Sequence, residues 1–450
     1  MTHPVLFGTD GMRGVAGEYP LQKPLLRKLG AAAADVYRQY ISDRSPVFLL
    51  GRDTRGSGPW IAGAFAEGAG TRNILISDLG IISTPSLAHL VPGRNALGGV
   101  MISASHNPAA FNGVKLFGPT GRKCPDEWER QIEREIHGMK KVPRTKSSLH
   151  SDPKALGEYI DFLLHTVPPR FSLKGMTLVV DCGNGSMSAI APRLLKKLGA
   201  RVIAIGTQPN GKNINLGVGS QHPERMQRIA LEKHADGGIA FDGDADRAIF
   251  CDEFGRILNG DYVLACAAHC LKEEGRLKDN AVVITVMANL GLVKALESWG
   301  IESVATSVGD RFVSDVLFER GYSVGGEQSG HIIFPEYLPT GDGLLTALQV
   351  LSMVRHRRKP LSWIYSLLRR YPQVLLNVEV KEKKPIEDCP EIREKIEKAR
   401  QVLGDQGRVV VRYSGTEPLL RIMMEGPEES LLHSLTEAIA SSARRELSRS

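Results

Sequence analysis

The sequence has little of what marks membrane proteins, secreted proteins and nucleic-acid-binding proteins. No apolar run approaches the roughly 18 residues that a membrane helix needs, and no basic segment followed by an apolar core opens the sequence, so we expect no signal peptide. Aromatic residues make up only 6% of the chain, and its net charge of +7 is dispersed without interleaved aromatic residues. These absences predict that neither a membrane nor a nucleic acid is a partner.

The six cysteines follow neither a metal-binding spacing nor a disulfide pattern. Reduced thiols are typical of the cytoplasm, which is where we expect the protein to be located. The composition, with 42% hydrophobic and 24% charged residues, is that of an ordinary globular protein. A chain of 450 residues is too long for one core and predicts about three domains.

Three regions of the chain repeat one order of elements: a strand, a glycine-rich or polar loop, a helix and a further strand. The strand-like runs that open these units include Pro4–Phe7, Val47–Leu50, Leu178–Asp181 and Ala281–Thr285. The repetition predicts three related α/β domains with mixed sheets. From Gln373 onward, the order strand, helix, strand, strand, helix predicts a C-terminal α+β domain.

We place the domain boundaries near Asp152, Arg256 and Tyr371. The segment Gly138–Asp152, with its lysines, prolines and serines, is the best candidate for a linker. The predicted domains are therefore 1–152, 153–256, 257–370 and 371–450.

Ser105 follows the apolar run Leu97–Ile102, which predicts a buried strand, and Asn107-Pro108 then turns the chain. Loops at strand ends are where α/β proteins place their chemistry. A Ser–His hydrolase is one interpretation, but neighbours on an extended chain point to opposite sides, so we expect His106 to be badly placed to accept the Ser105 proton. The G-x-S-x-G elbow of hydrolases is also absent. Ser105 therefore needs a partner elsewhere in the chain.

That partner is the segment Asp242-Gly-Asp-Ala-Asp-Arg247. Carboxylates at alternate positions of an extended segment project to one side, and three hard oxygen ligands suit Mg²⁺ or Ca²⁺. The spacing also matches the start of an EF-hand loop. However, Arg247 stands where that loop requires glycine, and the flanking residues favour strands rather than helices. We therefore predict a metal-binding turn between two strands.

Two further stretches suit a phosphorylated sugar. Gly325–His331 places a carboxylate, a hydroxyl and an imidazole on a glycine-rich loop, as a polyol-binding site would. Arg412–Pro418 offers a guanidinium, two hydroxyls and backbone amides flanked by glycine, which suits a phosphate dianion. Each stretch alone would be an ordinary glycine-rich turn.

In this order, the four stretches resemble the α-D-phosphohexomutase superfamily, whose members carry a phosphoserine loop, a metal loop, a sugar loop and a phosphate loop. Within it, the chain is most similar to the bacterial phosphoglucosamine mutase family. The likeness runs from residue 5 to about residue 426. The segments that carry it are Phe7–Gly14, Ile102–Pro108, Val286–Gly291, Gly326–His331 and Ser414–Pro418. It implies that the four domains are arranged around a central cleft.

The resemblance also implies an activity. This is the interconversion of glucosamine 6-phosphate and glucosamine 1-phosphate, through a phosphoserine enzyme and a bisphosphate intermediate, which supplies UDP-N-acetylglucosamine synthesis. A phosphomannomutase/phosphoglucomutase is the alternative. A non-enzymatic sugar-phosphate binder is a third class, but such a protein would be expected to have lost Ser105 or one of the aspartates.

The same resemblance implies the cofactors and partners. We expect one Mg²⁺ per chain, with glucosamine 1,6-bisphosphate or glucose 1,6-bisphosphate as the phosphorylating activator. The expected partner is a small-molecule hexose phosphate, and the chain is expected to be a monomer or a homodimer.

The residue roles are likewise implied by the resemblance. Lys115 and His331 would be the acid/base groups, and a lysine can serve only if its pKa is lowered, for which Arg13 and Arg247 are the expected cause. The implied catalytic residues are Ser105, Lys115, His331, Arg13 and Arg247, and the implied metal ligands are Ser105, Asp242, Asp244 and Asp246. The implied substrate-binding residues are His106, Glu327, Ser329, Arg412, Ser414, Gly415, Thr416 and Arg421. Tyr413 stands where this subgroup usually has proline or a small residue, a departure that concerns the stiffness of the loop rather than its donor groups.

Overall fold

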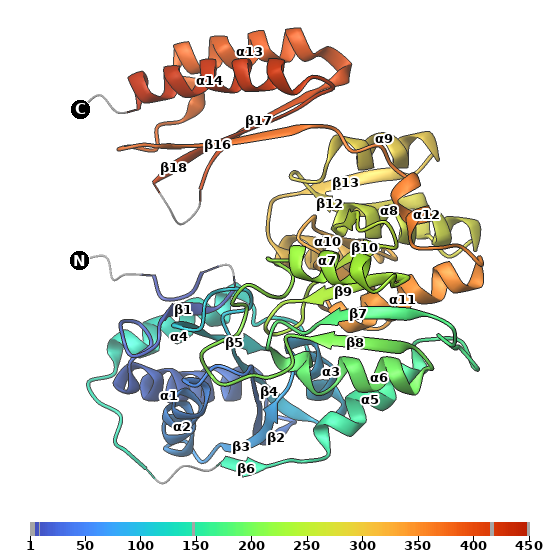
Figure 1. The fold of residues 1–450 in the computed structure, drawn as a ribbon. Helices are drawn as coiled ribbons and strands as arrows, with labels where there is room; N and C mark the ends of the chain where they lie inside the picture. Colours follow the sequence, from blue (N-terminus) through green and yellow to red (C-terminus); the bar gives the residue numbers. More distant parts are fainter. Residues whose placement is uncertain (1–4, 9, 146–148, 415–417, 448–450) are drawn as a thin grey trace.

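The computed structural model describes residues 5–8, 10–145, 149–414 and 418–447. Within these residues the chain forms four sheets, of which the first three combine parallel and antiparallel pairs and the fourth is antiparallel. Figure 1 shows the N-terminal sheet and its helices at one end of the molecule and the C-terminal sheet at the other. The predicted fold class, three α/β units followed by an α+β unit, is confirmed.

The first sheet has six strands in the order β1-β5-β4-β2-β3-β6. Its strands are β1 (Met12–Val15), β2 (Ser45–Arg52), β3 (Leu75–Ile81), β4 (Ala96–Ile102), β5 (Phe111–Phe117) and β6 (Leu149–Ser151). Its helices are α1 (Lys23–Tyr40), α2 (Gly58–Gly70), α3 (Thr84–Gly93) and α4 (Asp126–Gly138). Because side chains alternate along a strand, Phe48 and Leu50 of β2 pack under α1, α2 and α4, whereas Leu49 packs with α3 on the other face.

One expectation about this region needs correction. The described residues of the predicted strand Pro4–Phe7 form no strand, because the amides of Leu6 and Phe7 donate to Oε1 of Glu133 at 2.6 and 2.8 Å instead of to a neighbouring strand. The first strand is β1, which pairs antiparallel with β5. The segment predicted as a linker stays a prediction; near its end, β6 pairs in parallel with β3.

The second sheet has the order β11-β10-β9-β7-β8. Its strands are β7 (Thr177–Asp181), β8 (Arg201–Ile205), β9 (Gly237–Phe241), β10 (Ala248–Asp252) and β11 (Ile257–Leu258). The helices around it are α5 (Ala155–His165), η1 (Ser186–Ser188), α6 (Ala191–Lys197) and α7 (Glu224–Glu232). β9 and β10 form an antiparallel pair, and the short turn between them carries the three aspartates of the predicted metal loop.

The third sheet has the order β13-β12-β14-β15. Its strands are β12 (Ala281–Thr285), β13 (Glu302–Thr306), β14 (Gly325–Gly326) and β15 (Ile332–Ile333). The accompanying helices are α8 (Gly260–Glu273), η2 (Lys278–Asn280), α9 (Leu290–Ser298), α10 (Asp310–Arg320), α11 (Gly343–His356) and α12 (Ser362–Ser366). The predicted sugar loop connects β14 to β15.

The second and third regions share one hydrophobic core. Phe241 of β9 and Phe250 of β10 belong to the same buried cluster as Leu344 and Leu348 of α11, which lies about a hundred residues further along the chain. The first region and the C-terminal region have cores of their own. The molecule therefore combines three packed bodies, of which the central one contains two sheets. The predicted domain boundaries stay a prediction.

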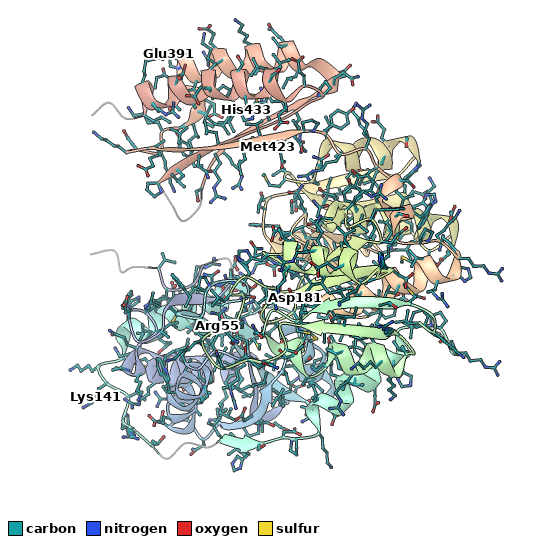
Figure 2. The ribbon with its side chains drawn as sticks, in the orientation of Figure 1. Arg55, Lys141, Asp181, Glu391, Met423 and His433 are labelled. Atoms are coloured by element: carbon teal, nitrogen blue, oxygen red, sulfur yellow. The ribbon has the colours of Figure 1, made fainter. Side chains whose placement is uncertain are left out.

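The C-terminal sheet has the order β16-β18-β17 and is antiparallel. Its elements are β16 (Gln373–Glu379), η3 (Ile386–Asp388), α13 (Pro390–Leu403), η4 (Gly404–Gln406), β17 (Arg408–Tyr413), β18 (Leu419–Glu425) and α14 (Glu429–Glu446). Ile422 and Met424 pack in the core beneath the two long helices. Met423, between them on β18, points to the opposite face, away from α13 and α14 (Figure 2).

Of the helices that the structure describes, none combines the length and the apolar character required to cross a membrane. All six cysteines are buried and none forms a disulfide.

Candidate active site

Ser105 lies in the loop that follows β4, where it is buried against the second sheet's metal loop. Its backbone has a φ of +50°, a left-handed conformation that residues other than glycine rarely adopt. The residue is 1% exposed, and its Oγ donates a hydrogen bond to Oδ2 of Asp242 at 2.6 Å. The serine loop and the predicted metal loop therefore meet at this side chain.

His106 lies against the same hydroxyl, with Nδ1 3.2 Å from Oγ of Ser105. The expectation that the two side chains point apart is wrong, because it assumed an extended chain and Ser105 is left-handed. Burial, together with Arg247 and Arg13, lowers the pKa of His106 to about 4. The imidazole is therefore neutral at neutral pH.

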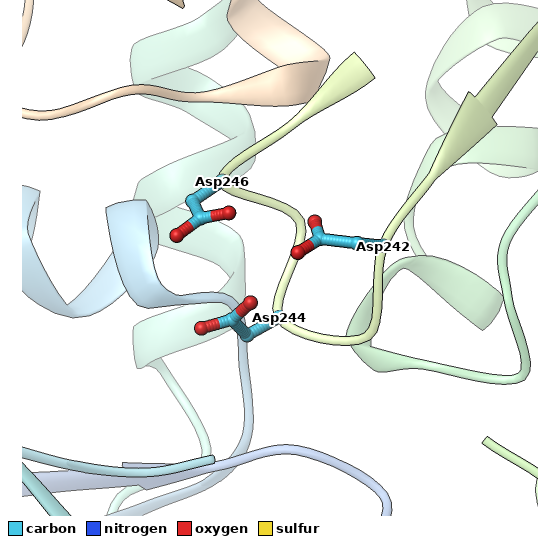
Figure 3. Close-up of side chains that lie close together, drawn as sticks. All are labelled: Asp242, Asp244 and Asp246. Atoms are coloured by element: carbon cyan, nitrogen blue, oxygen red, sulfur yellow. The ribbon is translucent and has the colours of Figure 1, made fainter. Parts of the chain in front are cut away.

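Asp242, Asp244 and Asp246 occupy the turn between β9 and β10, and Figure 3 shows their carboxylates converging. One oxygen of each lies within 4.8 Å of the others, and all three residues are buried. A Cβ at Gly243 would lie 2.7 Å from the carbonyl oxygen of Ser105, so glycine allows the two loops to approach this closely. Burial raises the pKa of Asp242, and the charges of Asp246 and Asp244 raise it further.

Lys115, on β5, is buried among carboxylates. Its Nζ lies 2.9 Å from Oδ2 of Asp244, 3.0 Å from Oδ2 of Asp10 and 3.7 Å from Oδ2 of Asp246. Burial lowers the pKa of Lys115, but the three carboxylates outweigh that effect and place the pKa above the ordinary value. Lys115 is therefore an ammonium group at neutral pH.

The expectation that Arg13 and Arg247 lower the pKa of Lys115 below its ordinary value is therefore wrong. Arg13 does lower this pKa, but its contribution is smaller than that of the surrounding carboxylates. Arg13 is itself paired with Asp10, and Nε of Arg247 lies 3.8 Å from Oδ1 of Asp246. Both guanidinium groups are partly buried beside the cluster and contribute positive charge to it.

His331, the last residue of the sugar loop, is buried beside Asp246. Its Nδ1 lies 3.7 Å from Oδ2 of Asp246, and its Nε2 accepts a hydrogen bond from the Gly341 amide at 3.0 Å. Burial lowers the pKa of His331, while Asp246, Asp310 and Glu327 raise it to a net value above the ordinary one. The Gly341 amide opposes protonation of Nε2, so it favours the tautomer with its proton on Nδ1.

The sugar loop holds Glu327 and Ser329 as a pair. Ser329 Oγ donates to Oε2 of Glu327 at 3.3 Å, and the Gly309 amide donates to Oε1 at 3.0 Å. The loop packs tightly on the start of α8, where the Gly260 amide donates to the carbonyl oxygen of Gln328 at 3.0 Å. A Cβ at Gly260 would lie 1.9 Å from the carbonyl oxygen of Glu327, so this close packing requires glycine.

Arg412 and Arg421 are direct neighbours across the β17–β18 ladder. Both line a small cavity with Met287 of the third region, on the sheet face opposite α13 and α14. Burial and the charge of Arg421 lower the pKa of Arg412. Because like charges directly across a ladder destabilise a sheet, this pair is suited to an anion that lies between the two guanidinium groups.

The phosphate loop follows β17, and Gly415 and Thr416 lie outside the described residues. Ser414 is buried, and its carbonyl oxygen accepts a hydrogen bond from Nζ of Lys383 at 2.6 Å. The Tyr413 hydroxyl donates to the carbonyl oxygen of Lys384 at 2.6 Å. Tyr413, the residue that differs from the usual proline or small residue, thus connects the end of β17 to Lys384.

Comparison with known proteins gives matches along the whole chain. Family models described as phosphoglucomutase/phosphomannomutase alpha/beta/alpha domains I, II and III and C-terminal domain match residues 4–142, 157–255, 259–371 and 375–442. The phosphoglucosamine mutase of Desulforamulus reducens is 44% identical over 440 residues, which cover 97% of this chain and 98% of that protein. That of Geobacillus thermodenitrificans is 45% identical over 446 residues, with 98% of each chain covered. The chain belongs to the phosphoglucosamine mutase family.

Solved structures of lower identity share the fold. A phosphoglucomutase/phosphomannomutase family protein from Burkholderia thailandensis has a TM-score of 0.82 at 22% identity and covers 99% of this chain and 98% of its own. The Aspergillus fumigatus N-acetylphosphoglucosamine mutase, solved with GlcNAc-6P and magnesium, has a TM-score of 0.70 at 19% identity, with coverages of 98% and 95%.

In this member of the phosphoglucosamine mutase family, the aspartate turn fits a hard divalent cation. Among the described residues, Oδ1 of Asp244 and Oδ1 of Asp246 are buried without a hydrogen-bond partner. Oδ2 of Asp244 is already engaged by the Thr84 hydroxyl at 2.6 Å and by Lys115. Buried carboxylate oxygens without partners are costly, and Mg²⁺ prefers such ligands, so the free oxygens are suited to it.

The site also contains charged residues that were not predicted from the sequence. Lys123 places Nζ 2.5 Å from Oδ1 of Asp10 and 2.6 Å from Oδ2 of Asp310, which joins the first and third regions beside His331. A cavity of about 530 Å³ opens next to this pair, and His331 forms part of its wall. Asp10 belongs to the segment Phe7–Gly14, which carries part of the family resemblance. The sequence could not predict its contacts with Lys115 and Lys123.

Proposed function

We propose that the protein interconverts glucosamine 6-phosphate and glucosamine 1-phosphate and that Ser105 carries the phosphoryl group. The observation that carries this proposal is the contact of Ser105 Oγ with Asp242 in the buried aspartate turn. Membership of the phosphoglucosamine mutase family supports the choice of substrate. Glucosamine 1,6-bisphosphate or glucose 1,6-bisphosphate would phosphorylate Ser105 at the start.

The proposed reaction has two transfers at the same serine. The bond from phosphorus to Ser105 Oγ breaks as a bond to the free sugar hydroxyl forms, and the hydroxyl proton passes to a protein base. The resulting bisphosphate turns round in the site and returns its other phosphoryl group to Ser105. Asp242, Asp244, Asp246 and an oxygen on Ser105 would hold Mg²⁺, which would supply positive charge to balance that of the phosphoryl group.

Lys115 and His331 are the proposed acid/base groups. Lys115 keeps its proton among three carboxylates, so it is suited to donate a hydrogen bond or a proton to the departing oxygen. His331 exchanges a proton closer to neutral pH than a lysine does, which suits it to the complementary role. Arg13 and Arg247 add positive charge beside the transferred group.

The remaining proposed contacts form two sets, one for the sugar hydroxyls and one for the phosphate that is not reacting. Glu327 and Ser329 bind the sugar hydroxyls in either orientation, supported by their mutual hydrogen bond, and His106 contributes from the serine loop. Arg412 and Arg421 hold the phosphate that is not reacting, together with Ser414, Gly415 and Thr416.

Side-by-side coupled assays with glucosamine, glucose and mannose 1-phosphates and 6-phosphates test the proposal. We expect kcat/KM for the glucosamine phosphates to exceed the others by at least about tenfold, because a site with hydrogen bonds to the amino group rejects analogues that lack it. Faster turnover of mannose or glucose phosphates would identify a phosphomannomutase/phosphoglucomutase instead. A complete lack of turnover in the phosphorylated protein would contradict the proposed function.

A further inference from the structure

Arg55 is a charged side chain in the interior of the first domain. It lies in the short connection between β2 and α2, residues 53–57, and it is 1% exposed, which places it among the largest fully buried side chains. Figure 2 shows it within the N-terminal part of the ribbon. The two residues that flank it contact the second region, since Thr54 Oγ1 donates to the carbonyl oxygen of Asn184 and the Gly56 amide donates to that of Gly211. Burying a guanidinium is costly unless all of its donors are used.

All five N–H donors of the Arg55 guanidinium have partners, and four of the acceptors are backbone carbonyls of the serine loop. Nε donates to Oδ2 of Asp53 at 2.9 Å. Nη2 and Nη1 donate to the carbonyl oxygens of Ser105 (3.0 Å), Asn107 (2.8 Å), Pro108 (2.5 Å) and Phe111 (2.9 Å). The loop from Ser105 to the start of β5 is therefore wrapped around one planar group.

The backbone N–H of Ser105 is also linked to Asp53 and Arg55, through the Ser103 hydroxyl. Asp53 Oδ2, which neutralises Arg55, also accepts a hydrogen bond from the Ser103 hydroxyl at 2.7 Å. That hydroxyl in turn accepts the Ser105 amide at 2.9 Å. Both the N–H and the C=O of Ser105 thus connect to the buried Asp53–Arg55 pair.

The second region adds one more donor to this arrangement. Asn215 Nδ2 donates to the carbonyl oxygens of Ser105 at 2.9 Å and Asn107 at 3.2 Å. A left-handed serine is unfavourable by itself and persists only where its surroundings determine it strongly. Here three side chains, Arg55, Ser103 and Asn215, hold its two backbone groups, and Oγ consequently points at Asp242.

We propose that Arg55 is a positioning residue for phosphoryl transfer: by holding the carbonyl oxygens of the serine loop, it aims Ser105 Oγ at the aspartate turn. Arg55 acts in this way only if Ser105 carries the phosphoryl group, so the role rests on the proposed function. Transfer requires close alignment of attacking and leaving oxygens, and a misplacement of about 1 Å costs about a hundredfold in rate. The guanidinium does not contact the sugar loop or Arg412, so substrate binding is outside its role.

The variant Arg55→Lys tests this role, because lysine keeps the charge but has three donors on one atom instead of five in a planar fork. We expect kcat to fall about a hundredfold while KM for glucosamine 6-phosphate stays within about twofold. Single-turnover transfer from the phosphorylated enzyme should slow by the same factor as kcat. In Arg55→Ala, millimolar guanidinium should restore part of kcat, whereas it should leave wild-type kcat unchanged.

Phe65→Leu is the matched control. Phe65 is buried in the same domain on α2, where it packs edge-on against Phe48 of β2 in the core beneath α1. If Phe65→Leu lowers the unfolding free energy as much as Arg55→Lys does, its kcat per folded molecule should still equal that of the wild type. Circular dichroism measures the folded fraction of each variant. If Phe65→Leu loses as much kcat as Arg55→Lys, or if folded Arg55→Lys keeps kcat within threefold of the wild type, the positioning role is wrong.

If Arg55→Lys does not fold, Asn215→Ala decides the question from the other domain. It removes a donor to the same two carbonyl oxygens, so kcat should fall about tenfold with unchanged KM, and an unchanged kcat would overturn the proposal. If the wild type acts on mannose or glucose phosphates instead, the proposed substrate is wrong. The kcat values of the wild type and of Arg55→Lys are then compared with the substrate on which the wild type acts, and they test the positioning role of Arg55 independently of the sugar.

Discussion

Ser105 Oγ lies 2.6 Å from Asp242 Oδ2 although the two residues are 137 positions apart in the sequence. One belongs to the first sheet's loops and the other to the β9–β10 turn of the second sheet. The proposed nucleophile and the three aspartates therefore come from different packed bodies, and the proposed reaction depends on how these bodies are held together. Hydrogen bonds such as that of Thr84 to Asp244, which cross the same junction, maintain this arrangement.

Phosphorylation of Ser105 is the first testable prediction. Incubation with glucose 1,6-bisphosphate should add one phosphate to the intact protein, because Ser105 Oγ faces the aspartate turn that would stabilise it. Peptide mapping by mass spectrometry should place that phosphate on Ser105, and Ser105→Ala should abolish both the label and turnover. Ser298→Ala, on the exposed face of α9, serves as a control and should keep both the label and turnover. A phosphate on another residue would rule out this mechanism.

The metal requirement gives a second prediction. Asp244→Asn keeps the shape of the side chain but removes one charge from the turn, so kcat should fall at least about a hundredfold, the size of a lost electrostatic contact in the transition state. Chelation should abolish the activity of the wild type, and added Mg²⁺ should restore it. Asp161→Asn, on the exposed side of α5, is the control and should behave like the wild type. Full activity after thorough chelation would contradict the assignment.

The arginine pair gives a third prediction. Arg412→Ala removes one of two guanidinium groups that face each other across β17 and β18, and a charge-assisted contact is worth about 1.5–3 kcal/mol. KM for the 1-phosphate and the 6-phosphate should therefore both rise by about ten- to a hundredfold. Free bisphosphate should also accumulate during turnover, because the intermediate escapes before it has turned round.

Arg400→Ala, on the exposed face of α13, is the matched control for Arg412→Ala and should leave both KM values unchanged. If Arg412→Ala raises KM for only one of the two substrates, the loop serves a single phosphate position. The scheme in which the bisphosphate turns round in one site would then need revision.

Asp261, at the start of α8, gives a prediction about stability and pH. Its Oδ2 accepts hydrogen bonds from Nε2 of Gln328 at 2.9 Å and from the Asn289 amide at 3.2 Å, and burial raises the pKa of Asp261 to about 6. An aspartate in an unfolded chain has a pKa of about 3.9. The folded protein thus holds this proton more tightly, so the contribution of Asp261 to stability is complete below about pH 4 and is lost as the pH rises through about 6.

Urea unfolding of the wild type and of Asp261→Asn between pH 4 and pH 7.5 measures this effect. Asparagine does not titrate, so the unfolding free energy of the wild type should fall relative to the variant by up to about 3 kcal/mol as the pH rises across this range. A difference between wild type and Asp261→Asn that does not change with pH would contradict the shifted pKa.

The sequence predicted those features that depend on local pattern and on residue chemistry. The apolar run before Ser105 predicted a strand that the structure confirms as β4. The alternation of Asp242, Asp244 and Asp246 between strand-like residues predicted a turn in a strand pair, and β9 and β10 confirm it. The order of elements after Gln373 likewise predicted the antiparallel C-terminal sheet.

Features that depend on distant contacts could not be predicted in this way. The left-handed backbone of Ser105 is imposed by Arg55 and Asn215, and neither is adjacent to it in the sequence. The protonation state of Lys115 depends on Asp10 and Asp244, which approach it from two other loops. The expectation about His106 was wrong because it judged the side chain from its neighbour in the sequence. The expectation about Lys115 was wrong because it considered two cations, Arg13 and Arg247, and left out the carboxylates that surround the ammonium group.

The hydrophobic core that joins the second and third sheets has a consequence for synthesis of the chain on the ribosome. Phe241 and Phe250 emerge with β9 and β10, but the helix that covers them, α11 (Gly343–His356), is made about a hundred residues later. Until then the part of the second sheet's apolar face that α11 covers is exposed, and such a surface is prone to aggregate. The first domain, whose core lies within its own residues, can finish folding while the central body is still waiting for α11.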